Sequence, residues 1–409
     1  MPKLAKYFQC TGCMLCKEVC PKGAIGMVLK NGFQYPQVNK QICIDCKLCE
    51  KYCPIVSTKV LTSDIGDTLP YSVKSEDDNR RNNSASGGFF IELASYFFDR
   101  YKEKCHVVGA YLDGLEVKHI IVTQQSDLYL LQGTKYISSE IGGIYKSVYR
   151  LLKQNNFVLF TGLPCQTYAL KKYLDGKAYK GELVICDLIC NGVPSGKLLE
   201  IDIKNNLQDI NKIISFRDKI NGWNNCLAFT YETTDNHIVR LDCKDSFFLS
   251  AFKVNYALRD SCYQCPYCTI ERTSDFTLGD YWGGNHTLDD QEKGVSLVLC
   301  HNKNAKKILF DISTIDWRRI SWKDCLPHNP RIYCGRRFVQ WIIPRMILNV
   351  IWHCSYNIQN QILTNNLGII SKKRYYWLPL KIWQMLIVKI ESYYRQVKLK
   401  NILRIYRDF

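Results

Sequence analysis

Apolar runs and turns alternate over residues 157–195 in a pattern that predicts an α/β domain. Residues 157–160 form a short apolar run typical of a buried strand, and a turn then leads into a helix that reaches Leu174. The plan repeats with a strand over 183–189 and an exit turn over 190–195. Because the carboxyl ends of parallel strands lie along one edge of a sheet, we expect the two exit turns to border one crevice.

Each exit turn carries a cysteine, and the pattern places Cys165 at the N-terminus of its helix. The helix field is expected to lower the pKa of that thiol and to favour the thiolate, which could ligate iron or attack an electrophile. Cys190, in the second turn, is a candidate for the same site.

Further elements extend this domain on both sides. Strands are expected over 107–112, 117–123, 227–232, 275–283 and 294–299, and a helix over 246–258. A Ser- and Gly-rich stretch, Ser84 to Gly88, opens another helix with an apolar stripe from Phe90 to Tyr101. Its backbone N–H groups could bind a phosphate, and the alternative is capping by Ser84 or Ser86 with no ligand.

Polar and charged residues dominate positions 57–83 and predict a connector between two domains. We therefore expect four parts in the chain. They are an N-terminal domain over residues 1–60, a linker over 61–83, an α/β domain over 84–330 and an extension over 331–409.

The formal net charge of +17 lies mainly in the extension, because residues 1–330 contribute only +5. Residues 331–409 hold fourteen Lys and Arg against two acidic residues, interleaved with aromatic side chains. This composition predicts a helical basic tail that packs on the α/β domain or makes peripheral contact with an anionic membrane. The apolar run 378–390 is too short and too charged to span a bilayer. No nucleic-acid-binding module is recognised, so no nucleic acid partner is expected.

The cysteines give the most specific signal in the chain. Two runs of the form C-x2-C-x2-C-x3-C-P, the spacing of bacterial ferredoxins, comprise Cys10, Cys13, Cys16 and Cys20, and Cys43, Cys46, Cys49 and Cys53. In two-cluster ferredoxins the last cysteine of each run crosses to the other cluster. The spacing therefore predicts two 4Fe-4S clusters in an α+β ferredoxin-like domain, one bound by Cys10, Cys13, Cys16 and Cys53, the other by Cys20, Cys43, Cys46 and Cys49. Structural or zinc-binding cysteines are the alternative.

A third run, Cys262, Cys265 and Cys268, offers only three local ligands. A third 4Fe-4S cluster would need a distant thiolate, for which Cys165 and Cys190 are the candidates, and zinc with a remote fourth cysteine is the alternative. The 21 cysteines are dispersed through a long chain with no apolar signal segment at its start, so we expect a reducing cytoplasm, with the tail placing the protein at most at the inner face of the membrane.

Several motifs in order resemble the coenzyme F420 hydrogenase/dehydrogenase beta-subunit family. These motifs are Ser86-Gly87-Gly88, Lys135-Tyr136, Gly162 to Gln166, Cys190 to Ser195, Phe216 to Lys219 with Gly222-Trp223, the Cys262 run, and Gly279 to Gly283 with Gly294 to Ser296. The resemblance covers residues 1 to 300 or so. Asn191 stands where many relatives carry histidine.

The resemblance implies an α/β domain that binds a flavin, FAD, and carries its own 4Fe-4S cluster. By this analogy, Ser86, Gly87 and Gly88 lie near the flavin phosphates, and Lys135 and Tyr136 lie near the flavin or the substrate. Neither a G-x-G-x-x-G dinucleotide motif at a strand-to-helix turn nor a P-loop is present in the sequence.

Together these features predict an iron–sulfur flavoprotein oxidoreductase. Electrons would pass between a ferredoxin or another redox partner protein, the clusters and a flavin that reduces or oxidises a small or carrier-linked substrate, as in coenzyme F420 chemistry. Two other hypotheses remain open. One is a noncatalytic electron-transfer subunit that feeds a separate catalytic partner, and the other is a remnant that keeps its clusters for structure.

Overall fold

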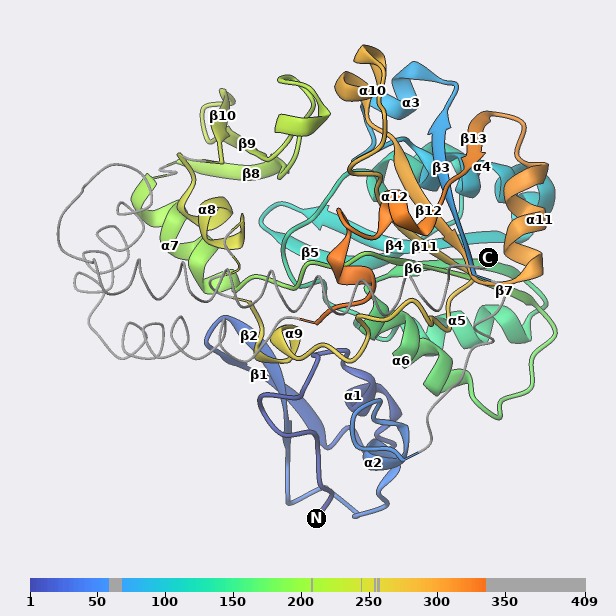
Figure 1. Cartoon of the computed structure of the whole chain (residues 1–409). Helices are drawn as coiled ribbons and strands as arrows, with labels where there is room; N and C mark the ends of the chain where they lie inside the picture. The colour runs from blue at the N-terminus through green and yellow to red at the C-terminus, as the bar shows by residue number, and fades with distance from the viewer. Residues whose placement is uncertain (59–67, 207–208, 244, 254, 256–257, 336–409) are drawn as a thin grey trace.

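An eight-stranded mixed sheet forms the centre of the larger domain, with the strand order β13-β3-β12-β11-β7-β6-β4-β5 (Figure 1). In the computed structural model of the chain, the described residues are 1–58, 68–206, 209–243, 245–253, 255 and 258–335. The strands of this sheet are β3 (Leu69–Ser75), β4 (Cys105–Asp113), β5 (Glu116–Val122), β6 (Phe157–Gly162), β7 (Glu182–Leu188), β11 (Phe276–Asp280), β12 (Ser296–Cys300) and β13 (Ile315–Arg319).

The strands β4, β6, β7 and β11 run parallel to one another, and the other neighbouring strands pair antiparallel. The apolar run at the start of β6 is buried on both faces, as parallel strands require. The sequence-based prediction of an α/β domain is confirmed, with a mixed sheet at its centre.

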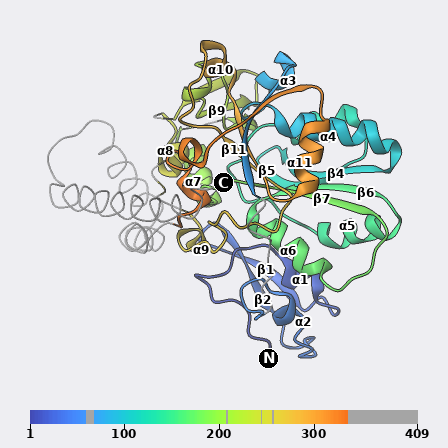
Figure 2. The same ribbon diagram turned by 45° about the vertical axis from the view of Figure 1, so that its right-hand side comes forward.

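Helices cover both faces of this sheet (Figure 2). On one face, α4 (Phe89–Tyr101) and α11 (Lys303–Asp311) pack into one hydrophobic core with β3, β4, β6 and β12. On the other, α5 (Ile144–Lys153) and α6 (Pro164–Leu174) bury Tyr145, Val148 and Leu170 against Phe160 of β6. The helical stripe expected over residues 90–101 therefore faces the sheet.

The linker expected over 61–83 is wrong in part, because β3 lies inside the sheet between β12 and β13 and is followed by α3 (Asp78–Asn82). Leu69, Tyr71 and Val73 alternate with polar residues, as in a strand. The polar composition of the flanking residues concealed this period. Residues 59–67 lie outside the described part.

A second sheet has the order β10-β9-β8 and packs with α7 and α8 around its own core. The helix expected over 246–258 is shorter than expected, as α8 ends at Lys253. The elements here are α7 (Gly196–Asn206), β8 (Ile210–Ser215), β9 (Ala228–Thr233), β10 (Ile238–Asp242) and α8 (Phe247–Lys253). The shorter helices are α9 (Asp260–Tyr263), α10 (Leu288–Lys293), α12 (Trp322–Cys325) and the 3-10 helices Lys102–Lys104, Gln125–Leu131, Trp223–Asn225 and Pro330–Ile332.

The N-terminal unit pairs β1 (Ile25–Lys30) with β2 (Phe33–Val38) in an antiparallel hairpin, flanked by α1 (Leu15–Val19) and α2 (Leu48–Tyr52). Figure 1 shows this unit below α5 and α6. Met14 and Leu15 are buried in the same core as α5 and α6, so the unit is docked on the α/β domain.

The tail expected over 331–409 lies outside the described residues from position 336 onward. Among the helices that are described, none combines the length and the apolar character needed to cross a membrane.

Candidate functional site

The structure brings the cysteines of the N-terminal unit together in two sets. In the first set, Cys13 and Cys16 interact electrostatically with Cys10 and Cys53, and burial is the main reason that the pKa of Cys13 rises to about 12. The two runs thus exchange their last cysteines, since Cys53 of the second run joins the first set.

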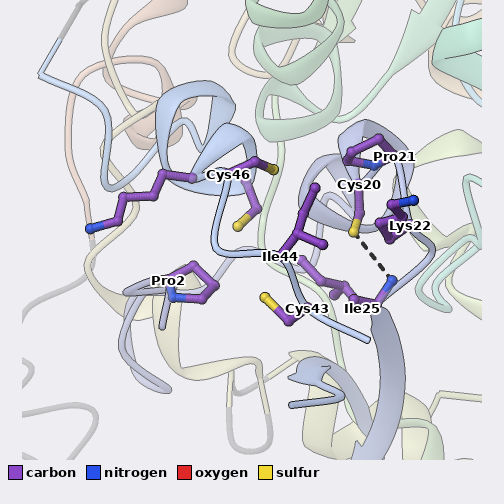
Figure 3. Close-up of a pocket in the computed structure, with 11 residues that line it drawn as sticks. Pro2, Cys20, Pro21, Lys22, Ile25, Cys43, Ile44 and Cys46 are labelled. Atoms are coloured by element: carbon purple, nitrogen blue, oxygen red, sulfur yellow. Dashed lines mark hydrogen bonds between the residues drawn. The ribbon is translucent and has the colours of Figure 1, made fainter. Parts of the chain in front are cut away.

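The second set consists of Cys20, Cys43, Cys46 and Cys49, which line one small pocket. Figure 3 shows the sulfur atoms of Cys20, Cys43 and Cys46 turned toward the same space. Cys20 Sγ accepts a hydrogen bond of 3.2 Å from the backbone N–H of Ala24. Cys46 is exposed, so the second set is the one nearer to solvent.

A third set forms where the Cys262 run meets the two strand-exit turns. Cys165 interacts with Cys190 and Cys262, Cys190 with Cys262 and Cys268, and Cys265 with Cys165. Five thiols therefore gather where a cubane needs four, so both Cys165 and Cys190 are in reach as the distant ligand.

Hydrogen bonds hold the turns that carry Cys165 and Cys190. The Gln166 side chain accepts from the Leu163 backbone N–H at 2.9 Å, which fixes the start of α6, and the Val193 N–H donates to Cys262 Sγ at 3.4 Å. The expectation that Cys165 has a lowered pKa is wrong. Burial raises its pKa well above the usual value, and the neighbouring thiols add to this effect. The helix field is outweighed because the thiol has lost its water.

The first and third sets lie side by side. Cys165 interacts electrostatically with Cys13 of the first set, and Tyr267 interacts with both of these thiols. The Tyr145 hydroxyl donates to the Cys13 carbonyl oxygen at 3.0 Å. The contact between the two domains therefore also joins the two sets of thiols.

A cavity of about 1200 Å³, the central cavity, opens at the carboxyl ends of β6, β7 and β11. Both strand-exit turns line it, which confirms the expected crevice. Cys190 lines it too, so the third set borders the cavity. Ser86, Gly88, Lys135 and Tyr136 also line it, whereas Gly87 does not.

Gly87 instead packs against the sheet behind the loop. A β-carbon at this position would lie 2.3 Å from the Val73 carbonyl oxygen and 2.5 Å from the Ser296 nitrogen, so only glycine fits. The Ser86 and Ser296 hydroxyls are 2.9 Å apart. These contacts bring the Ser84–Gly88 loop close to β3 and β12, with its outer side toward the cavity.

Lys219 fixes the same loop from the other side. Its Nζ donates to the carbonyl oxygens of Arg81 at 2.6 Å and Ser86 at 2.7 Å, and also to that of Lys293. Burial lowers the pKa of Lys219 to about 7, with smaller contributions from the positive charges of Arg217 and Arg81. Lys219 belongs to a motif noted in the sequence, but its role as a clamp was not expected.

Lys135 lies half-buried in the cavity wall. Its Nζ donates to the carbonyl oxygens of Leu131 at 3.0 Å and Gln132 at 2.6 Å, and burial lowers its pKa to about 7. Tyr136 packs against Phe252, with ring centroids 4.4 Å apart, and burial raises its pKa to about 12. Lys135 can thus gain or lose a proton near neutral pH, whereas Tyr136 stays protonated.

His119 is a cavity residue that the sequence analysis missed. Its Nε2 lies 3.2 Å from the Thr161 carbonyl oxygen, which can only accept, so Nε2 carries the hydrogen and Nδ1 is an acceptor. Nδ1 is buried and has no hydrogen-bond partner among the described residues. Burial lowers the pKa of His119 to about 4, so the ring is neutral. A single histidine on an apolar strand gave no signal in the sequence.

An ion pair forms another part of the cavity wall. Arg217 donates two hydrogen bonds of 2.9 Å to Asp280, and the Trp223 indole N–H donates to the same carboxylate at 3.0 Å. Trp223 stacks on Trp282 with ring centroids 4.3 Å apart. Two motifs far apart in the sequence thus build one wall.

The donors in these sites fit the groups that the sequence predicted. Sets of cysteine thiols without carboxylates suit iron–sulfur clusters. The cavity has the size of a large cofactor together with a substrate, and it holds a close glycine loop, a neutral histidine and a half-buried lysine.

Comparisons with known proteins agree with the motifs. Residues 156–316 match the family model for the C-terminal part of the coenzyme F420 hydrogenase/dehydrogenase beta subunit, and residues 9–56 match that of a 4Fe-4S dicluster domain. The resemblance is confirmed, although the Ser86 and Lys135 motifs lie outside the matched ranges. These matches support iron–sulfur electron transfer and an oxidoreductase character for the chain.

Other comparisons add little. A search of the curated proteins finds no match. Among solved structures, a chain of the F420-reducing NiFe hydrogenase complex from Methanosarcina barkeri aligns at 17% identity. The alignment covers 67% of this chain and 92% of that chain at a TM-score of 0.45, which is too low to carry an argument.

Proposed function

We propose that the protein is an iron–sulfur flavoprotein oxidoreductase. In this proposal, the first and second sets each hold one 4Fe-4S cluster, the third set holds another, and the central cavity binds FAD and a small or carrier-linked substrate. A ferredoxin-type protein is the electron donor or acceptor. The observation that supports the proposal is the electrostatic interaction of Cys13 with Cys165, together with the place of Cys190 in the cavity wall.

These relationships suggest an order of the sites from the surface to the cavity. The second set holds the exposed Cys46, the first set interacts electrostatically with the third through Cys13 and Cys165, and the third borders the cavity through Cys190. A flavin bound in the cavity would exchange single electrons with the clusters and a hydride with the substrate. The direction of flow is open, because the same order of sites serves oxidation and reduction.

The docking of the N-terminal unit supports this order. The Glu18 carboxylate accepts from the backbone N–H groups of Gly143 and Lys146 at 3.1 Å each, and these groups lie at the start of α5. The Lys172 ammonium donates to the Ser57 hydroxyl at 3.0 Å. Because both ends of the unit are held, the first set stays beside the third.

The chain's own residues have distinct tasks at the cavity. The Ser84–Gly88 loop, held by Lys219, offers backbone N–H groups to the phosphates of the cofactor. His119 forms part of the cavity wall as a neutral ring. Lys135 Nζ supplies a positive charge or a proton, because its pKa lies near neutral pH.

The deciding experiment is the release of flavin from protein purified without oxygen and then denatured. We expect about one FAD per chain, and we expect reduced ferredoxin to bleach it in the native protein. Intact clusters with no flavin would overturn this proposal in favour of a noncatalytic electron-transfer subunit. If the protein releases no flavin and is not reduced by ferredoxin, we would conclude that its clusters serve structure alone.

A further inference from the structure

Arg259 links the α/β domain to the first set of cysteines. It stands immediately before α9 and three residues before Cys262, yet its side chain reaches into the N-terminal unit. Figures 1 and 2 both show α9 beside β1 and β2. The side chain is only 2% exposed, which is unusual for an arginine.

The guanidinium contacts a cysteine of the first set directly. Nε donates to the Cys10 carbonyl oxygen at 2.7 Å, and Nη2 donates to the Gln34 carbonyl oxygen at 2.8 Å. Nη2 also lies 3.7 Å from Cys10 Sγ, within range for an N–H donor to sulfur. The group sits 4.3 Å from the centroid of the Tyr35 ring. Its position is therefore fixed on three sides.

The backbone of the first run makes room for this side chain. A β-carbon at Gly12 would lie 2.6 Å from Nη1 of Arg259, and Gly12 has a φ of +72°, which glycine adopts readily. Because residue 12 is glycine, the guanidinium can lie against the backbone between Cys10 and Cys13.

In the part of the chain that the structure describes, no carboxylate oxygen lies within ion-pair distance of the Arg259 guanidinium. Burying a cation without a nearby anion is strongly unfavourable, because the charge loses its hydration and gains no compensating attraction. A 4Fe-4S cluster with four thiolates is such an anion, and its negative charge grows by one when it is reduced.

We propose that Arg259 sets the reduction potential of the cluster in the first set by stabilising its reduced form. The inference rests on the proposed function, since it needs the clusters to be present. The nearby positive charge and the hydrogen bond to Cys10 Sγ both favour the added electron, so both raise the potential.

The consequence is that the first cluster can exchange an electron with the second cluster despite its burial. Cys46 of the second set is exposed, so water can stabilise the reduced cluster there, whereas no cysteine of the first set is exposed and Cys10 is buried. The positive charge of Arg259 stabilises the reduced first cluster and so offsets the loss of water on burial. One electron from a ferredoxin-type donor can then pass from the second cluster to the first, with no bond made or broken.

The test is a redox titration of the full chain followed by electron paramagnetic resonance. We expect Arg259→Gln to shift the potential of one N-terminal cluster to more negative values, and Arg259→Lys to shift it less. Cys46→Ser perturbs the second set, so the signal that this variant alters belongs to the second cluster. That signal should be the one that stays unshifted in Arg259→Gln. Arg240→Gln removes the same charge from β10, where Arg240 pairs with Asp218 and Asp242, and should leave every potential unchanged.

The outcomes separate this inference from the proposed function. Unshifted potentials in Arg259→Gln with full iron content would overturn the role of Arg259 and leave the proposed function intact. Equal shifts in Arg240→Gln would also overturn it. If Arg259→Gln binds less iron, Arg259→Lys becomes the test, and an unchanged potential in that variant contradicts the inference. Native protein without clusters would instead refute the proposed function.

Discussion

Lys219 Nζ donates a hydrogen bond of 2.7 Å to the Ser86 carbonyl oxygen, across 133 positions of the chain. The same ammonium group also binds the Arg81 and Lys293 carbonyl oxygens. One side chain of the Phe216–Lys219 motif therefore holds the loop that forms one wall of the central cavity. Two motifs that were separate in the sequence are parts of one structure.

Lys219→Met should loosen this loop, because three carbonyl oxygens lose their donor. We expect the free energy of unfolding to fall by about 1–3 kcal/mol, since this is the usual cost of leaving buried groups unpaired. Flavin content should fall with it. Thermal unfolding and flavin release measure both effects. Lys212→Met, which removes an exposed ion pair with Glu232, is the control and should change neither.

Gly87→Ala tests whether the close approach of the loop to the sheet matters for the cofactor. The new β-carbon would clash with the Val73 carbonyl oxygen and the Ser296 nitrogen, so the loop must move. We expect a severalfold loss of bound flavin with unchanged iron content. Gly26→Ala, where nothing lies within 4 Å of the added carbon, should retain the native flavin content. Full flavin content in Gly87→Ala would show that the cofactor binds elsewhere.

His119→Ala removes a buried ring from the wall of the central cavity. The ligand would lose the packing of this ring, so we expect the flavin dissociation constant to rise about tenfold, or ~1.4 kcal/mol. Equilibrium titration of the flavin-depleted protein measures this change. The matched control is His106→Ala, since His106 bonds to the Lys104 carbonyl oxygen at the surface. An unchanged constant in His119→Ala would remove this residue from the site.

The titration of Lys135 near neutral pH predicts that flavin binding depends on pH. Its pKa of about 7 in the free protein should rise when the anionic phosphates of FAD are nearby, because a negative charge favours the ammonium form. Binding then takes up a proton above pH 7, so affinity should weaken as the pH rises from 7 to 9.

Lys135→Arg separates this effect from the titration of Lys219, whose pKa is also about 7. Arginine keeps its charge throughout this range, so the variant should bind flavin with little change from pH 7 to 9. A slope that persists in Lys135→Arg would assign the titration to Lys219 or to the ligand.

Cys265→Ser should remove the cluster of the third set and leave the other two. Iron should fall by about one third, because three equal clusters share it. Reduced ferredoxin should still reduce the remaining clusters but no longer bleach the flavin. Cys243→Ser alters a thiol of the same domain outside the third set and should keep all the iron. Full iron in Cys265→Ser would show that Cys265 is not a ligand of the third cluster.

The local features of this chain could be predicted from sequence because they depend on neighbouring residues. The spacing of the Cys10 and Cys43 runs indicated a ferredoxin-type domain, and the apolar run at 157–160 indicated a buried strand. The crevice at the strand-exit turns followed from the geometry of parallel strands. The helical stripe from Phe90 to Tyr101 was likewise found as α4.

Tertiary structure decided what depends on residues distant in the chain. Burial among other thiols raises the pKa of Cys165, although its place at a helix N-terminus favours the opposite direction. His119 Nδ1 is buried without a hydrogen-bond partner, and the Arg259 guanidinium is buried without a carboxylate among the described residues. Both environments form only when strands and loops from different parts of the chain enclose these side chains. Sequence patterns report local period and ligand spacing, whereas desolvation and long-range pairing are set by the folded chain as a whole.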